Sequence, residues 1–254
     1  MKDDLGKLAS DLERLLKLRS FPFGMMLCER REQMDGIARI RRPKAIHTLD
    51  QIVGQTARLG FTIGVTADDL VGPQCRAVVG LGHAKDAEWK SGRQMAGVWY
   101  ATLEDSQAHQ AAMDCVPDGQ YEALVVSPLA AGRIEPAIAL FYATPGAMMY
   151  FINGLQWSGY KRFDWSVVGE SSCADSWGRA LKTGQPSLSI PCYAERRYGG
   201  VLDDEMLMAL PPATLAQAIA GMEALAKNGL RYPFAQYGIQ QDARAGLEVS
   251  YPKK

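Results

Sequence analysis

The sequence predicts a single α+β domain over residues 1–230, with a mixed β-sheet flanked by helices, and a C-terminal tail over residues 231–254. Amphipathic stretches typical of helices are interspersed with short apolar runs typical of buried strands. The two kinds do not alternate in the regular order of a parallel α/β sheet. No internal repeat, low-complexity segment or linker-like change of composition divides the chain, and 254 residues suffice to bury a core without disulfides or metals.

The first third of the chain is predicted from its leucines, capping residues and glycines. Leucines three and four positions apart define the first helix, which Pro22 ends. Thr48 is predicted to cap the next helix at its start, and Gly60 to stop it. The predicted elements are a helix over 4–18, a strand over 21–28, an irregular segment over 30–46, a helix over 48–59 and a strand over 61–65.

The middle third contains one poorly periodic segment, 83–100, which mixes aromatic, charged and glycine residues. Because surface excursions of this kind commonly carry binding residues, we expect it to lie over a pocket. Thr144 followed by Pro145 has the cap-then-proline pattern of a helix start. The other predicted elements are a loop over 68–82, a helix over 103–115, strands over 121–127 and 136–142, and a helix from 144 onward.

The last third is divided by Gly184, by the pair Pro211-Pro212 and by Gly229, each of which stops a predicted helix. Residues 231–254 show no such pattern and form the predicted tail. The predicted elements are a strand over 163–168, a helix over 173–182, a strand over 187–190, a short helix over 203–210 and an amphipathic helix over 214–227.

Charge and hydropathy exclude several functional classes. The chain has 28 basic and 28 acidic residues, a formal net charge of zero and no long block of like charge, so we expect neither nucleic-acid nor anionic-membrane binding. The N-terminus lacks a signal-peptide pattern, and no apolar run approaches the ~20 residues that span a bilayer. We therefore expect a cytoplasmic protein whose partner is a small-molecule ligand, and a homodimer is compatible with the sequence.

Familiar cofactor and catalytic motifs are absent from the sequence. Gly80-Leu81-Gly82 lacks the third glycine and the following helix of a dinucleotide fingerprint, and neither GxSxG nor HExxH occurs. His47, His83 and His109 are too scattered to predict a His-rich metal site. The five cysteines are widely spaced without a CxxC pair, which fits reduced thiols in the cytoplasm. No organic cofactor is expected, and a metal or iron–sulfur cluster stays an open alternative.

The most unusual segment, 187–206, places Cys192 at the end of a predicted strand, followed by Arg196 and Arg197. Neighbouring positive charge stabilises a thiolate, so Cys192 is a candidate nucleophile or metal ligand. Guanidinium groups suit bidentate anion binding, so Arg196 is a candidate catalytic residue and Arg197 a candidate for binding a carboxylate or phenolate. The alternative is a buried structural cysteine, with the arginines paired to the acidic residues at 203–205.

Cys173 lies where a helix is predicted to begin, and the amides of a first helical turn favour a thiolate. It is the second candidate catalytic cysteine, and the alternative is a packed thiol behind a cap formed by Ser171 or Ser172. Cys75 also follows a turn and precedes an apolar stretch. If these junctions converge, Cys75, Cys173 and Cys192 could ligate a metal or a cluster with one open position.

The stretch from Met148 to Tyr160 is the best candidate for the wall of an apolar pocket. Met148, Trp157 and Tyr160 would bind the substrate, because methionine adapts to irregular ligands and aromatic rings stack on planar ones. The alternative is an ordinary helix core.

These segments together resemble the uncharacterised ArCR family, domain of unknown function 169, over roughly residues 15–226. The resemblance implies a bacterial or archaeal intracellular protein and transfers no established activity. It rests on Thr66-Ala67-Asp68-Asp69-Leu70 with Gly72-Pro73-Gln74-Cys75, on Ser127-Pro128-Leu129 with Pro145-Gly146-Ala147-Met148, and on Cys173-Ala174-Asp175 with Thr183-Gly184-Gln185-Pro186, Pro191-Cys192, Arg196, Tyr198, Gly200 and Asp204-Glu205-Met206.

Two departures from the family pattern bear on the site. Members often carry a further cysteine just ahead of the helix over 51–58, where Asp50 or a neighbour stands in this chain. The missing thiol argues against a four-cysteine cluster. Ala194 stands where the pattern commonly has glycine, so the backbone is expected to approach a ligand less closely.

Three functions stay open from the sequence. The first is a small-molecule enzyme, a lyase or a hydrolase, acting on a planar or aromatic organic acid without an organic cofactor. The second is a cysteine-ligated metal, iron–sulfur or haem protein serving in redox chemistry or sensing. The third is a non-catalytic protein that binds a ligand in the same pocket. We favour the enzyme, because compact chains of this size without interaction motifs are more often enzymes.

Overall fold

The computed structural model describes residues 2–82 and 87–242. Within these ranges, six strands form one sheet in the order β3–β5–β1–β6–β8–β7, and each neighbouring pair is antiparallel. A separate pair, β2 with β4, is parallel. The strands are β1 (Phe23–Cys28), β2 (His47–Thr48), β3 (Ile63–Thr66), β4 (Leu70–Val71), β5 (Ala123–Pro128), β6 (Ile138–Ala143), β7 (Ser187–Ser189) and β8 (Met206–Leu210). The predicted α+β domain is confirmed, and its parallel strand pair forms a second, smaller sheet.

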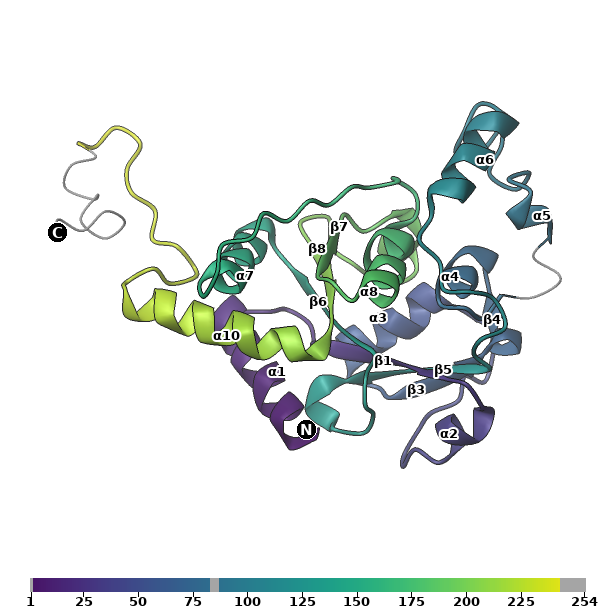
Figure 1. Cartoon of the computed structure of the whole chain (residues 1–254), viewed down its shortest axis with the longest axis horizontal. Coiled ribbons are helices and arrows are strands. Elements are labelled where there is room, and N and C mark those ends of the chain that lie inside the picture. The colour runs from purple at the N-terminus through teal and green to yellow at the C-terminus, as the bar shows by residue number, and fades with distance from the viewer. Residues whose placement is uncertain (1, 83–86, 243–254) are drawn as a thin grey trace.

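Helices cover both faces of the large sheet (Figure 1). Side chains alternate between the faces along each strand, so on β6 Tyr142 belongs to one core and Phe141 to the other. The helices on the Phe141 side are α1 (Lys2–Leu16), α7 (Pro145–Gln156) and α10 (Pro212–Lys227). Those on the Tyr142 side are α3 (Leu49–Leu59), α4 (Pro73–Val78), the π-helical turn η4 (Ala174–Gly178) and α8 (Arg179–Thr183). Two of the three predicted site cysteines, Cys75 and Cys173, belong to the core beneath this second group.

The other helices are short or peripheral, and α5 and α6 extend away from the sheet (Figure 1). None of the helices formed by residues 2–82 and 87–242 has the length and apolar composition needed to cross a bilayer. The remaining helices are α2 (Arg31–Asp35), η1 (Ala67–Asp69), α5 (Ala87–Lys90), α6 (Leu103–Ala112), η3 (Leu129–Ala131) and α9 (Tyr193–Arg197).

Helix α3, which contributes Asp50 to the site described below, has a clear cap at each end. The Thr48 hydroxyl accepts from the Gln51 amide at 3.1 Å, and the Gln51 side chain accepts from the Thr48 amide at 2.9 Å. Gly60 ends the helix in the left-handed conformation, at φ 72°. The predicted start and end of this helix are therefore confirmed.

Four predicted elements are wrong. The segment 30–46, predicted to be irregular, contains α2, and the predicted loop over 68–82 contains β4 and α4. Met206–Leu210 is the strand β8, not a short helix, because a five-residue apolar run has no polar face to expose and fits a strand buried between two neighbours, β6 and β7. Residues 163–168 form no strand. Phe163 and Trp165 instead stack on each other in an irregular segment, with ring centroids 5.3 Å apart.

The described part of the predicted tail, residues 231–242, contains neither helix nor strand. Its first residues are nonetheless packed. The Tyr232 hydroxyl lies 2.9 Å from the Thr144 hydroxyl, and its ring stacks on Tyr150 at a centroid distance of 6.5 Å. Residues 243–254 and His83 lie outside the described residues.

Candidate functional site

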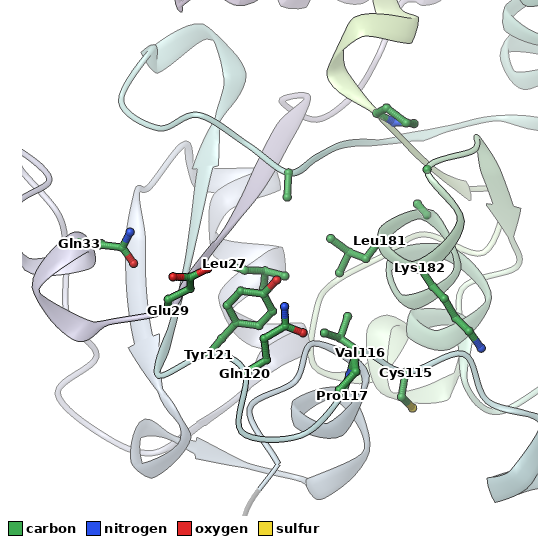
Figure 2. A pocket seen from close by; sticks show the side chains of 14 residues that line it. Leu27, Glu29, Gln33, Cys115, Val116, Pro117, Gln120, Tyr121, Leu181 and Lys182 are labelled. Carbon is green, nitrogen blue, oxygen red and sulfur yellow. The ribbon is translucent and has the colours of Figure 1, made fainter.

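A cavity of about 690 Å³ is lined by none of the predicted site residues. Leu27, Tyr121 and Leu181 line it together with Gln120 and Cys115 (Figure 2). Its basic group, Lys182, is paired with Asp114 at 2.7 Å. This cavity therefore combines apolar walls with a cation that is already paired.

A smaller cavity, of about 430 Å³, is lined by Cys75, Cys192 and Asp50 among others. We call it the thiol cavity. Cys75 lies on α4, and its sulfur is 3.5 Å from the sulfur of Cys173, just ahead of η4. The same Cys75 sulfur is 3.8 and 3.9 Å from the two carboxyl oxygens of Asp50. Three segments far apart in the sequence thus converge, as the positions of the cysteines suggested.

Two glycines allow the backbone contact that positions Asp50. A Cβ placed on Gly54, in the middle of α3, would lie 2.3 Å from the carbonyl oxygen of Gly199. A Cβ placed on Gly199 would lie 3.0 Å from the carbonyl oxygen of Asp50. Because neither residue has a side chain, α3 packs directly on the turn that follows α9. This contact holds the first turn of α3 beside the segment that begins at Cys192.

A fully buried carboxyl group, Glu195, is connected to the thiol-bearing segments by hydrogen bonds. It accepts hydrogen bonds from the Tyr142 hydroxyl at 2.8 Å and from the Ser172 hydroxyl. Ser172 in turn accepts from the backbone amide of Cys192 at 3.0 Å. This chain fixes Cys192 against the residue that precedes Cys173, so the relative position of two of the thiols is set by hydrogen bonds.

Burial sets the electrostatics of the site. Burial, followed by the neighbouring Glu195 carboxyl group, raises the pKa of Asp50 from 3.8 to about 7. Burial also raises the pKa of Cys192, with Glu195 again contributing. The hydrogen bond to Cys173, followed by burial, raises the pKa of Cys75 well above its ordinary value. The thiols are therefore protonated at neutral pH, while Asp50 exchanges its proton there.

This result corrects the predicted electrostatics of Cys192, because no guanidinium stabilises its thiolate. The Arg196 side chain donates to the carbonyl oxygens of Pro191 and Leu202, at 3.0 and 2.6 Å, and lies 3.6 Å from Asp203. Arg197 is exposed and hydrogen-bonds the Tyr193 hydroxyl. Neither arginine lines the cavity, because both are held on the outer side of α9 by other partners.

The predicted apolar wall is also placed elsewhere. Met148 is 1% exposed and belongs to the core between α7 and the sheet. Trp157 and Tyr160 are 48% and 82% exposed. Helix α7 turns its buried side toward the opposite face of the sheet, so none of these three residues lines the thiol cavity.

Aromatic side chains of other segments form the wall. Trp89 and Trp99 come from the segment predicted to lie over a pocket, and Tyr193 and Tyr198 come from α9 and its end. Trp99 meets Tyr193 edge-on at a centroid distance of 5.5 Å. The cavity therefore suits a planar ligand.

Sequence reasoning missed three carboxyl groups of the site. Asp50 and Glu170 line the cavity, and Glu195 lies behind it. One signal pointed to Asp50, because it stands near the position where family members often carry a further cysteine. The structure places its carboxyl group beside the Cys75 sulfur.

The donor set fits a thiol-ligated metal only in part. Three sulfurs and a carboxylate are suitable donors for a soft or borderline metal. Yet among the side chains described, no group of three or more His, Cys, Asp or Glu residues is arranged so that it could hold a metal ion. The close pair of Cys75 and Cys173 supplies two donors, and the third sulfur does not complete the set.

Fold and site together define an α+β protein with a thiol–carboxyl cavity on one face of an antiparallel sheet. Residues 11–221 match the family described as uncharacterised ArCR, COG2043, domain of unknown function 169, and the chain belongs to this family. It is also similar to an uncharacterized protein, MJ0308, of Methanocaldococcus jannaschii, with 24% identity over 124 residues. That match covers 48% of this chain and 53% of the relative, so the chain spans about half the relative's length. No solved structure matches the chain.

Proposed function

We propose that the protein is a small-molecule enzyme, a lyase or a hydrolase that works without an organic cofactor, and that the thiol cavity is its active site. One observation carries the proposal. Asp50 is 3% exposed, lies against the sulfur of Cys75, and has a pKa of about 7 at the wall of an aromatic cavity. A carboxyl group that titrates near neutral pH is matched to general acid–base catalysis.

Each residue of the cavity has a separate role in the proposed reaction. Asp50 accepts a proton from the substrate, or from an attacking water, and returns it to the leaving group. Cys75 donates a hydrogen bond to Asp50 and so stabilises its carboxylate form. Cys192 presents a protonated thiol that donates a hydrogen bond to the substrate. The aromatic wall holds a planar substrate and excludes water from the reacting atoms.

The organic-acid part of the expected function loses its support, because it depended on two arginines that lie outside the cavity. The cytoplasmic location is kept as part of the proposal. All five cysteines are free thiols, including a pair only 3.5 Å apart, and such a pair persists in a reducing compartment.

The test is conversion of small molecules by purified, chelator-treated protein. Fractionated bacterial metabolites are incubated with wild type, Asp50→Asn, Cys192→Ala and Arg196→Ala, and the products are identified by mass spectrometry. Cys28→Ser, at a buried thiol packed elsewhere in the core, is the matched control. We expect turnover by wild type, Cys28→Ser and Arg196→Ala, and a loss of at least about 100-fold in Asp50→Asn.

Two results would contradict the proposal that this cavity is the active site of an enzyme. Conversion that persists unchanged in both Asp50→Asn and Cys192→Ala would move the chemistry out of this cavity. Ligand binding without conversion by any of the proteins would instead identify a non-catalytic binder.

A second candidate is a thiol-ligated metal or iron–sulfur protein, favoured by the 3.5 Å separation of the Cys75 and Cys173 sulfurs. Cys75 and Cys173 would supply two ligands, and Cys192 and Asp50 would have to move toward them to complete the set, because the described side chains form no ready group of three donors. Elemental analysis and an optical spectrum of anaerobically purified protein separate the candidates. Stoichiometric metal that is lost in Cys75→Ser and kept in Cys28→Ser would support the metal protein.

A further inference from the structure

The described lining of the thiol cavity has an unusual balance of charge. Asp50 and Glu170 both line it, and residues 2–82 and 87–242 contribute no lysine, arginine or histidine to its walls. Burial raises the pKa of both carboxyl groups. An anionic ligand would meet two acids there without a compensating cation, at a high electrostatic cost in a desolvated site.

The aromatic wall already binds a planar cation within the chain. The guanidinium of Arg197 lies over the rings of Tyr193 and Tyr198, at 5.5 and 5.6 Å from their centroids. Arg197 is exposed, so solvent and salt screen its charge from the cavity. Its position shows that these rings attract a flat cation through their faces.

One buried donor in the wall lacks a partner. Trp89 is 6% exposed, and its indole N–H makes no hydrogen bond with any part of the chain that the structure describes. A buried donor of this kind is normally satisfied, so a ligand of the cavity is expected to bring an acceptor for it. The carboxyl oxygens of Asp50 and Glu170 can accept further hydrogen bonds from a ligand, and the indole N–H of Trp89 can donate one to it.

We propose that the cavity binds a planar cation of the amidine or amino-azine class, whose N–H edge faces Asp50 and Glu170 and whose ring lies among Trp99, Tyr193 and Tyr198. An acceptor atom on the same ring system meets Trp89. A carboxyl group and an amidine-type edge form two parallel, charge-assisted hydrogen bonds, which is the strongest recognition available to these walls. The proposal names the substrate class of the enzyme proposed above and rests on the same cavity.

Three probes of the same shape and different charge test the proposal: benzamidine, benzamide and benzoate. Binding to the full chain at pH 7.5 is followed by calorimetry. We expect benzamidine, a cation, to bind at least about tenfold more tightly than the neutral benzamide, and benzoate to bind most weakly. The preference for benzamidine should fall to within about threefold in Asp50→Asn and in Glu170→Gln.

Glu29→Gln is the matched control, because Glu29 lines the larger cavity (Figure 2). It should keep the full preference. Three results would overturn the proposal: benzoate bound as tightly as benzamidine, a preference that survives in both cavity variants, or no binding of benzamidine at any soluble concentration. Turnover that depends on Asp50 despite such a result would leave the enzyme standing and refute only the ligand class. A preference for the cation without turnover would support the ligand class and refute only the enzyme.

Discussion

Cys75 and Cys173 are 98 residues apart in the sequence, and their sulfurs are 3.5 Å apart in the structure. Cys173 is 1% exposed, whereas Cys75 is 9% exposed and lines the cavity. The hydrogen bond to Cys173, followed by burial, raises the pKa of Cys75 and so favours its protonated thiol. At the residue scale, the site is thus a reduced dithiol next to a titrating carboxyl group.

The first prediction concerns this dithiol. Diamide, a two-electron oxidant, should convert it to a disulfide, with loss of one proton from each thiol and transfer of two electrons to the reagent. The sulfurs need to approach from 3.5 Å to about 2.0 Å, a small displacement. Peptide mapping under non-reducing conditions should recover a Cys75–Cys173 link, in wild type and in Cys115→Ser alike. Recovery of Cys75 linked chiefly to Cys28 or Cys115 would contradict the geometry.

At the scale of elements, the contact between α3 and the turn after α9 holds the site together. The second prediction is that Gly54→Ala destabilises the protein by about 1–3 kcal/mol, because its Cβ would overlap the backbone of Gly199. Gly6→Ala is the control, a glycine within α1 whose added Cβ would be 3.8 Å from its nearest neighbour. It should be neutral or stabilising by up to about 1 kcal/mol. Chemical denaturation measures both, and equal effects would argue against the close contact.

Helices were predictable where the sequence carries its own boundary signals. The capping pair Thr48 and Gln51 and the cap-then-proline start at Thr144 are local, so periodicity and caps located both helices correctly. Strand β8 was not predictable in this way. Its five apolar residues fit a helix or a strand equally well, and only its pairing with β6 and β7, which involves distant segments, decides between them.

The sequence indicates which cysteines belong to the site, but it does not indicate which carboxyl groups do. Cys75, Cys173 and Cys192 stood out by their positions at element boundaries, and the fold brings two of them into contact. Nothing local distinguishes Asp50 from a first-turn helix residue that interacts with the helix dipole. Its role follows from burial, which depends on how α3, α4 and α9 pack together.

For the whole molecule, buried acids make stability depend on pH. The pKa of Asp50 is raised to about 7 and that of Asp175 to about 6, and burial also raises that of Glu195. A raised carboxyl pKa means that the folded state holds protons which the unfolded state has released. The contribution of these three groups to stability is therefore fully present below the ordinary carboxyl pKa and is lost as pH rises through the folded-state pKa.

The third prediction follows for Asp50→Asn. Between pH 4 and 7, wild type should lose up to about 1.4 kcal/mol of unfolding free energy per pH unit relative to this variant, which has no titrating group at that position. The other buried acids remain in both proteins, so their contributions largely cancel. Denaturation curves across this range measure the difference, and a difference that does not change with pH would contradict an elevated Asp50 pKa.

The central claim is that the Asp50 carboxyl group is desolvated beside Cys75 at the wall of the cavity. A carbon-13 NMR titration of the carboxyl resonances, with Asp50→Asn to assign the signal, tests it most directly. We expect a midpoint near pH 7 for Asp50. A midpoint near the ordinary value of 3.8 would show that water solvates this carboxyl group, and the acid–base site would then have no basis.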